Sequence, residues 1–130
     1  MFVAHVKISR SKRMHFNMNS YESGLFAEFL AKIYLRFHGF HIVKSRYITG
    51  RNTGRAEIDI IARRRNLMIF IEVKRRPNLD TAWAAITPAQ SVRLRRAAEN
   101  FIAKNGWCGD TRFDAILVCG LRIHWARGAL

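Results

Sequence analysis

The side chains best suited to chemistry are charged groups inside two apolar runs, with Glu57 and Asp59 in the first and Glu72 and Lys74 in the second. Burying a charge is costly unless the charge is paired or coordinated, so these positions require an explanation. Side chains alternate between the two faces of a strand, so each pair shares one face. Carboxylates brought together would repel one another and raise their own pKa values, and either the lysine or a hard divalent cation would relieve that repulsion.

Magnesium suits such a group of acids, because it binds one or two carboxylates and completes its shell with water and substrate phosphate. A divalent cation there would polarise a phosphodiester and lower the pKa of a bound water. Lys74 could orient or deprotonate that water, or stabilise charge that develops on phosphorus. The pattern Asp59…Glu72-Val73-Lys74 therefore predicts an Mg²⁺ or Mn²⁺ site. The alternative is a half-exposed hairpin with a cross-strand salt bridge, which would leave Glu72 and Lys74 exposed.

The elements that must position these residues are two strands, at about 55–62 and 67–74, joined by a hairpin at 63–66. A further strand is predicted at 41–47, before this hairpin, and two more at 112–119 and 121–126. A loop is predicted from Pro77 to Ala85. One helix is predicted before the first three strands in the sequence, and another after them. This order predicts an α/β fold, in which two main helices flank a mixed sheet.

Both helices carry capping signals. Asn19 with Glu22 begins a helix over 21–38, and Thr87 followed by Pro88 begins one that runs to about 104. The second helix is predicted to bury Leu94, Ala97, Ala98, Phe101 and Ile102. In the first helix, the main apolar stripe is Leu25, Phe26, Phe29, Leu30, Ile33 and Phe37, and a second face of mostly small residues is Gly24, Ala27, Ala31 and Leu35.

Composition sets the broad class. The 130 residues are 49% hydrophobic, which predicts one folded domain, and the net charge of +14 points to a polyanionic partner, first nucleic acid and then an anionic membrane surface. No apolar run is long enough to cross a bilayer. Cys108 and Cys119 have neither metal nor redox spacing, which predicts reduced thiols in a cytoplasmic protein. Residues 1–19 form a basic extension compatible with a short strand, a disordered arm or an upstream start site.

Four blocks of residues, taken together, resemble the YraN-like family of small endonuclease-like proteins. The blocks are Gly24 to Glu28, Asn52 to Ile61 with Ala56-Glu57-Ile58-Asp59 inside it, Ile69 to Arg76 with Glu72-Val73-Lys74, and Arg112-Phe113-Asp114-Ala115. The resemblance covers about residues 20–126. This family is similar to the PD-(D/E)XK group, which has Holliday-junction resolvases among its members. The resemblance implies a restriction-endonuclease-like domain over 20–130.

The resemblance also implies roles. Asp59 and Glu72 match metal-binding acids, Lys74 matches the catalytic lysine, Glu28 matches a first-helix glutamate near the metal, and Glu57 matches a helper glutamate. This sequence departs from the family pattern at Ala56, where the family has glycine, and at Gln90, where it usually has lysine. Arg63, Arg64, Arg65, Arg75 and Arg76 flank the predicted site in the sequence and, with Gln90 and Arg93, are expected to contact nucleic acid. Asp114 is expected to pair with Arg112 and not to be catalytic.

The sequence thus predicts a metal-dependent nuclease-like protein that acts on or binds DNA, with no membrane partner. A non-catalytic nucleic-acid-binding protein that kept the fold is the main alternative, and a basic structural protein with a salt-bridged surface hairpin is the third. Resolvase relatives act as dimers, so the resemblance extends to a homodimer, although no residues in the sequence mark a dimer face.

Overall fold

The computed structural model describes residues 18–50 and 54–130, so residues 1–17 of the predicted extension and Asn52 lie outside the described residues. In the described part, five strands form one sheet in the order β1-β2-β3-β4-β5. β3 and β4 are parallel and the other neighbouring pairs are antiparallel. The elements are α1 (Ser20–Phe37), β1 (His41–Thr49), β2 (Ala56–Arg64), β3 (Leu67–Arg75), α2 (Leu79–Ala84), α3 (Pro88–Asn105), β4 (Asp110–Cys119) and β5 (Arg122–Ala126). The predicted mixed α/β class is confirmed.

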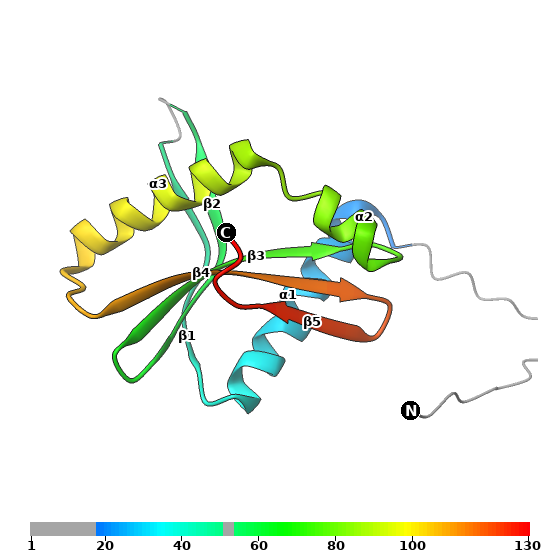
Figure 1. Ribbon diagram of the computed structural model, residues 1–130, viewed down its shortest axis with the longest axis horizontal. Helices are drawn as coiled ribbons and strands as arrows, with labels where there is room; N and C mark the ends of the chain where they lie inside the picture. The colour runs from blue at the N-terminus through cyan, green and yellow to red at the C-terminus, as the bar shows by residue number, and fades with distance from the viewer. Residues whose placement is uncertain (1–17, 51–53) are drawn as a thin grey trace, which may run out of the picture.

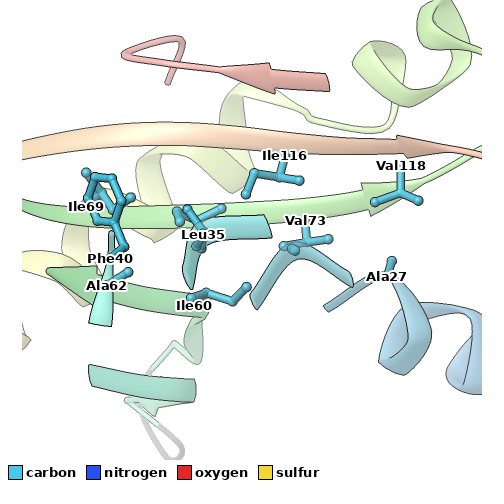
Figure 2. Close-up of a cluster of buried hydrophobic side chains, with 11 residues drawn as sticks. Ala27, Leu35, Phe40, Ile60, Ala62, Ile69, Val73, Ile116 and Val118 are labelled. Carbon is cyan, nitrogen blue, oxygen red and sulfur yellow. The ribbon is translucent and has the colours of Figure 1, made fainter. Parts of the chain in front are cut away.

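The sheet lies between α1 on one face and α3 on the other (Figure 1). Apolar residues on alternating positions of β2, β3 and β4 fill both interfaces, because successive side chains of a strand point to opposite faces. Figure 2 shows the α1 side, where Ala27 and Leu35 lie against sheet residues that include Ile60 and Val73. On the α3 side, Phe70 packs against Phe101, with ring centroids 6.0 Å apart. The buried centre of the sheet therefore fixes the strands that carry the charged residues.

α1 buries only one of its two apolar faces. The small-residue face, represented by Ala27, Ala31 and Leu35, is the buried one, whereas Phe29 and Phe37 of the predicted main stripe are 56% and 85% exposed. Short side chains let the helix approach the crowded sheet, where the large side chains of β2 and β3 already fill the space. The sequence indicated two apolar faces on this helix, and the structure buries the face with the smaller residues.

The segment predicted as a loop from Pro77 to Ala85 contains a short helix, α2. Asn78 begins it by accepting a hydrogen bond from the Thr81 N–H at 2.9 Å. Its buried Ala82 packs with Ala115 and Leu117 of β4. The two long helices begin as predicted, with capping boxes formed by Asn19 with Glu22 and by Thr87 with Gln90. The α3 cap therefore fixes the first turn of that helix beside the sheet.

Candidate active site

The candidate site lies where the sheet divides between β2 and β3. Their paired residues run from Arg64 with Leu67 to Ile60 with Ile71. The same register would next place Asp59 opposite Glu72, but the backbone pairing of the two strands ends before these residues. Here the Val73 N–H donates to the side chain of Asp59, at Oδ2, with a distance of 2.8 Å. Beyond this point β2 continues along β1 and β3 continues along β4, and the two pairs diverge (Figure 1). The division opens space for the charged side chains.

A pocket of about 400 Å³ occupies this division, and its walls are Arg55, Glu57, Asp59, Glu72, Lys74, Gln90 and Arg93. All four charged residues singled out in the sequence therefore meet in one place, as the alternation of side chains along β2 and β3 predicted. The first turns of α3 close the pocket with Gln90 and Arg93. Negative charge on the strands thus faces positive charge and amide groups on the helix.

The lysine is held against one of the acids. Lys74 Nζ lies 3.2 Å from Glu72 Oε1, and the two side chains are only 16% and 15% exposed. A charge pair so far out of water interacts more strongly than a surface pair, provided that both partners stay in place. This burial contradicts the alternative of an exposed, salt-bridged hairpin, in which Glu72 and Lys74 would be in solvent.

Burial is the main reason that the two acids of the pocket have raised pKa values. The pKa of Asp59 is raised well above its ordinary value, chiefly by burial and then by the charge of Glu72, while the Val73 N–H acts in the opposite direction. Burial also raises the pKa of Glu72, and the charge of Lys74 partly offsets this effect. A cation bound in this pocket would therefore stabilise the charged forms of both carboxylates.

These pKa shifts predict how stability responds to pH in the absence of metal. Below the ordinary pKa values of 3.8 for Asp59 and 4.5 for Glu72, the stabilising effect of the raised pKa values is fully present, and it is lost as pH rises through the raised values. The high positive charge of the protein adds its own pH dependence. We therefore expect the difference in unfolding free energy between Asp59→Asn and wild type to grow in favour of the variant as pH rises. Denaturant unfolding in chelator across this window measures the difference, and a constant difference would contradict the prediction.

Glu28 is near the pocket but is bound elsewhere. Its charge adds to the rise in the pKa of Asp59. Its Oε2 accepts a hydrogen bond from Arg46 Nε at 3.1 Å, and the Glu28 side chain is only 12% exposed. Arg46 lies across from Asp59, since its neighbours Ser45 and Tyr47 pair with Ile60 and Ile58. Arg46 also has a φ of 53°, a conformation that costs a residue with a side chain of order 1 kcal/mol.

Glu28 was predicted from the sequence to lie with Asp59 and Glu72 at the metal site. Within residues 18–50 and 54–130, no three His, Cys, Asp or Glu side chains are grouped closely enough to hold a metal ion. In this conformation the protein offers the carboxylates of Asp59 and Glu72, while Glu28 is paired with Arg46. Two acids are still a donor set that fits magnesium or manganese, because such ions complete their shells with water and phosphate oxygens.

Glu57 is at the outer part of the pocket. Its Oε2 lies 3.6 Å from Arg55 Nη2, and both side chains are substantially exposed, so this pair adds little to stability. Arg55 was not among the residues predicted from the sequence. It directly precedes β2 and lies two residues before Glu57, a spacing that places two side chains of an extended segment on one face. This spacing was the signal that could have found it.

The cations predicted to contact nucleic acid divide into separate groups. Gln90 and Arg93 line the pocket, whereas Arg64 and Arg65 line a different hollow of about 500 Å³ at the β2–β3 turn. The turn lies about 20 Å from the pocket, since a strand rises by about 3.3 Å per residue. Arg63 stacks on Trp107 at this same end, with its guanidinium carbon 4.7 Å from the ring centroid. Closeness in sequence to the Asp59 strand therefore does not bring these arginines to the pocket.

The remaining predicted cations follow β3 beyond Lys74. Arg75 turns toward α1, where its guanidinium carbon lies 4.7 Å from the centroid of the Phe26 ring. Arg76 is exposed, and its side chain donates to the Arg75 carbonyl at 2.7 Å. Neither residue lines the pocket, although both leave the same end of β3 that carries Glu72 and Lys74.

Gln90 has a second task besides lining the pocket. Its side-chain oxygen accepts the Thr87 N–H at 3.3 Å as part of the α3 cap. Its amide nitrogen is therefore the part of this side chain that can donate to a ligand.

None of the helices in the described part of the chain is long and apolar enough to cross a membrane.

The fold and the pocket define a small mixed α/β protein with an Asp–Glu–Lys site at a division of its sheet. Residues 27–118 match the uncharacterised protein family UPF0102. A UPF0102 protein of Paramagnetospirillum magneticum is 42% identical over 103 residues, covering 77% of this chain and 79% of that protein. A UPF0102 protein of Bradyrhizobium diazoefficiens is 42% identical over 101 residues, covering 76% and 73%. The chain belongs to family UPF0102, which confirms the YraN-like resemblance seen in its motifs.

Proposed function

We propose that this protein is a metal-dependent deoxyribonuclease that hydrolyses phosphodiester bonds in the pocket at the division of the sheet. The observation that carries the proposal is the meeting of Asp59, Glu72 and Lys74 in one half-buried pocket that also holds Arg55 and Arg93. Acids, a lysine and phosphate-binding cations together are what phosphodiester hydrolysis requires. The division of the sheet around Asp59 is also compatible with the restriction-endonuclease-like fold that the sequence resembles.

Each residue has a task in this proposal. Asp59 and Glu72 would hold an Mg²⁺ or Mn²⁺ ion, which when bound supplies charge to polarise the scissile phosphate and acidify a water. Lys74 is fixed by Glu72, so its ammonium is positioned to orient the attacking water and to stabilise negative charge as it develops. Arg93 and the amide nitrogen of Gln90 would donate to the phosphate groups on either side. The exposed Glu57 would sit at the outer part of the site.

A non-catalytic DNA-binding function is the second candidate, and one observation favours it. Glu28 is bonded to Arg46 and does not join Asp59 and Glu72, so this conformation offers fewer acidic ligands than the sequence predicted. The position of Gln90 also favours the non-catalytic function. The family usually has a lysine there, so this chain has one fewer cation to bind phosphate. Both candidates share the DNA partner and differ in the chemistry.

The deciding experiment is a cleavage panel with duplex, single-stranded, flap and four-way DNA, each with manganese, with magnesium and with chelator. Cleavage that requires the metal and is lost in Asp59→Asn supports the nuclease. Binding without cleavage of any of these substrates supports the non-catalytic function. Failure to bind any of them would exclude DNA as the partner.

DNA binding is expected to weaken steeply as salt rises, because cations that neutralise phosphates release condensed counterions. Arg93→Ala should weaken binding to all DNA sequences alike and reduce the salt slope by about one unit, the effect of losing one phosphate contact. Fluorescence anisotropy over a series of salt concentrations measures both quantities.

Lys104→Ala is the matched control for this measurement, because Lys104 is an exposed cation in the last turn of the same helix. It lies about 16 Å from Arg93 along the axis, since a helix rises by 1.5 Å per residue. Equal changes in slope for the two variants would mean that DNA responds to total charge and not to the pocket.

A further inference from the structure

The outer face of α1 carries large apolar side chains that the sheet leaves largely exposed, although Tyr21 among them is contacted by a sheet residue, with the Arg46 guanidinium carbon 5.5 Å from its ring centroid. Tyr21, Phe29 and Phe37 are 64%, 56% and 85% exposed, and Leu25 is 38% exposed. These residues recur every fourth position, so they lie along one side of the helix, opposite the buried alanines. With the half-buried Ile33 they form what we call the outer stripe: Tyr21, Leu25, Phe29, Ile33 and Phe37. Contiguous apolar surface of this kind marks an interaction site.

Two charged residues lie on the same side of α1 as the outer stripe. Glu22 and Arg36 are both exposed, and each lies seven residues from Phe29. Seven residues are close to two helical turns, so Glu22, Phe29 and Arg36 follow one line along the middle of the outer stripe. The line has an acid near its start, an aromatic ring at its centre and a base near its end. Phe29 is also at the middle of the helix, which runs from Ser20 to Phe37.

We propose that the outer stripe is a self-association surface and that its occupant is α1 of a second copy, packed antiparallel about a two-fold axis at Phe29. In that arrangement Tyr21 faces Phe37 of the second copy and Leu25 faces its Ile33. Glu22 of each copy faces Arg36 of the other through the carboxylate oxygen that does not accept the Asn19 N–H of the helix cap, so the same pairs form twice. Parallel packing would instead place Glu22 beside Glu22 and Arg36 beside Arg36, and these like charges would repel.

The arrangement suits the rest of the molecule. A net charge of +14 opposes the approach of two copies, so a contact needs apolar area and opposite charges at the point of approach, and the outer stripe supplies both. The pocket is closed by α3, which lies on the other face of the sheet, so an α1–α1 contact leaves the pocket of each copy open. The proposal does not depend on the chemistry of the pocket.

Cysteine cross-linking tests the geometry in the full-length protein carrying Cys108→Ser and Cys119→Ser. Phe29→Cys should form a cross-linked dimer with a short bismaleimide at high protein concentration, because the axis brings the two copies of this residue together and the reaction traps each dimer that forms, although loss of the aromatic ring weakens the association. Tyr21→Cys alone should not, since its two copies would be about 24 Å apart along the helix axes. A mixture of the Tyr21→Cys and Phe37→Cys proteins should give the mixed dimer. Efficient cross-linking of Tyr21→Cys to itself would overturn the antiparallel arrangement.

Sedimentation velocity over a range of concentrations tests the association itself. The wild type should form a dimer as concentration rises, and Phe29→Glu should weaken the association by about thirtyfold or more, as expected when the aromatic centre of an interface is removed. Val92→Glu is the control, because Val92 is an apolar residue of α3 that is 59% exposed and lies outside the outer stripe. Far-UV circular dichroism would confirm that both variants are folded. A wild type that stays monomeric at every soluble concentration, or equal loss in the two variants, would overturn the proposal.

Discussion

Asp59→Asn is expected to abolish DNA cleavage while DNA binding remains. The substitution keeps the shape of the side chain and removes a charge that would hold the metal. A metal ion stabilises the transition state by several kcal/mol, so the loss in turnover should be about a thousandfold or more. The same variant should be more stable than wild type near neutral pH without metal, because it no longer buries a carboxylate charge at position 59 and no longer places that charge beside Glu72. Cleavage assays and thermal melts with and without manganese measure the two effects.

Manganese should raise the melting temperature of the wild type and have little effect on Asp59→Asn, because a ligand stabilises the state that binds it. Asp80→Asn is a suitable control, since Asp80 is an exposed acid of α2 that is not among the residues lining the pocket. It should keep both cleavage and the response to manganese. If cleavage survives in Asp59→Asn, the activity belongs to another site or to a contaminating nuclease, and the proposed function is rejected.

Asp114→Asn is expected to cause the largest loss of stability of any conservative substitution discussed here. Asp114 is fully buried, and its carboxylate accepts hydrogen bonds from Arg112 Nε and Nη2, Trp125 Nε1 and the Gly128 N–H. An asparagine would present an amide NH₂ to some of these donors and leave the Arg112 guanidinium without its counter-charge. Breaking a buried ion pair costs about 3–5 kcal/mol, a large part of the stability of a domain of this size.

Denaturant unfolding would measure this loss, with Trp125→Phe as a graded comparison. That variant removes one donor to Asp114 and part of the ring surface that contacts Phe40, but it leaves the Arg112–Asp114 pair in place, so its cost should be smaller, about 1–3 kcal/mol. Cleavage by any folded Asp114→Asn protein should be retained, because Asp114 is not among the residues lining the pocket. A change in stability below about 1 kcal/mol would show that the network tolerates an amide, contrary to the expectation for a buried ion pair.

Local signals carried much of the prediction. Asn19 with Glu22 and Thr87 with Gln90 located the helix starts, because a cap depends on residues within one turn of each other. The short connection between β2 and β3 made these strands neighbours, and alternation along each strand then placed Glu72 and Lys74 together. The acidic part of the pocket could be found from the sequence because its determinants are short-range.

Contacts between elements that are far apart in the sequence could not be predicted. Two faces of α1 were apolar, and only the sheet, with its large side chains already in place, selects the face with Ala27 and Ala31. The pairing of Glu28 with Arg46 likewise depends on how α1 crosses β1, a tertiary relation with no sequence period. The hairpin arginines lie close in sequence to Asp59, but an extended strand carries them to the far end of the sheet.

The order in which the pocket residues come together during folding follows from the strand connections. Asp59 and Glu72 belong to a hairpin, which closes within microseconds, whereas Gln90 and Arg93 belong to the long crossover that must form before β4 can pair with β3. The acids would therefore approach each other before the α3 cations reach them, and their repulsion would raise the barrier to folding at neutral pH. We expect the refolding rate of the metal-free protein to increase as pH falls toward the ordinary carboxyl pKa range. Stopped-flow refolding measures this rate, with Asp59→Asn as the reference. An equal pH dependence of the refolding rate in the two proteins would contradict the expectation.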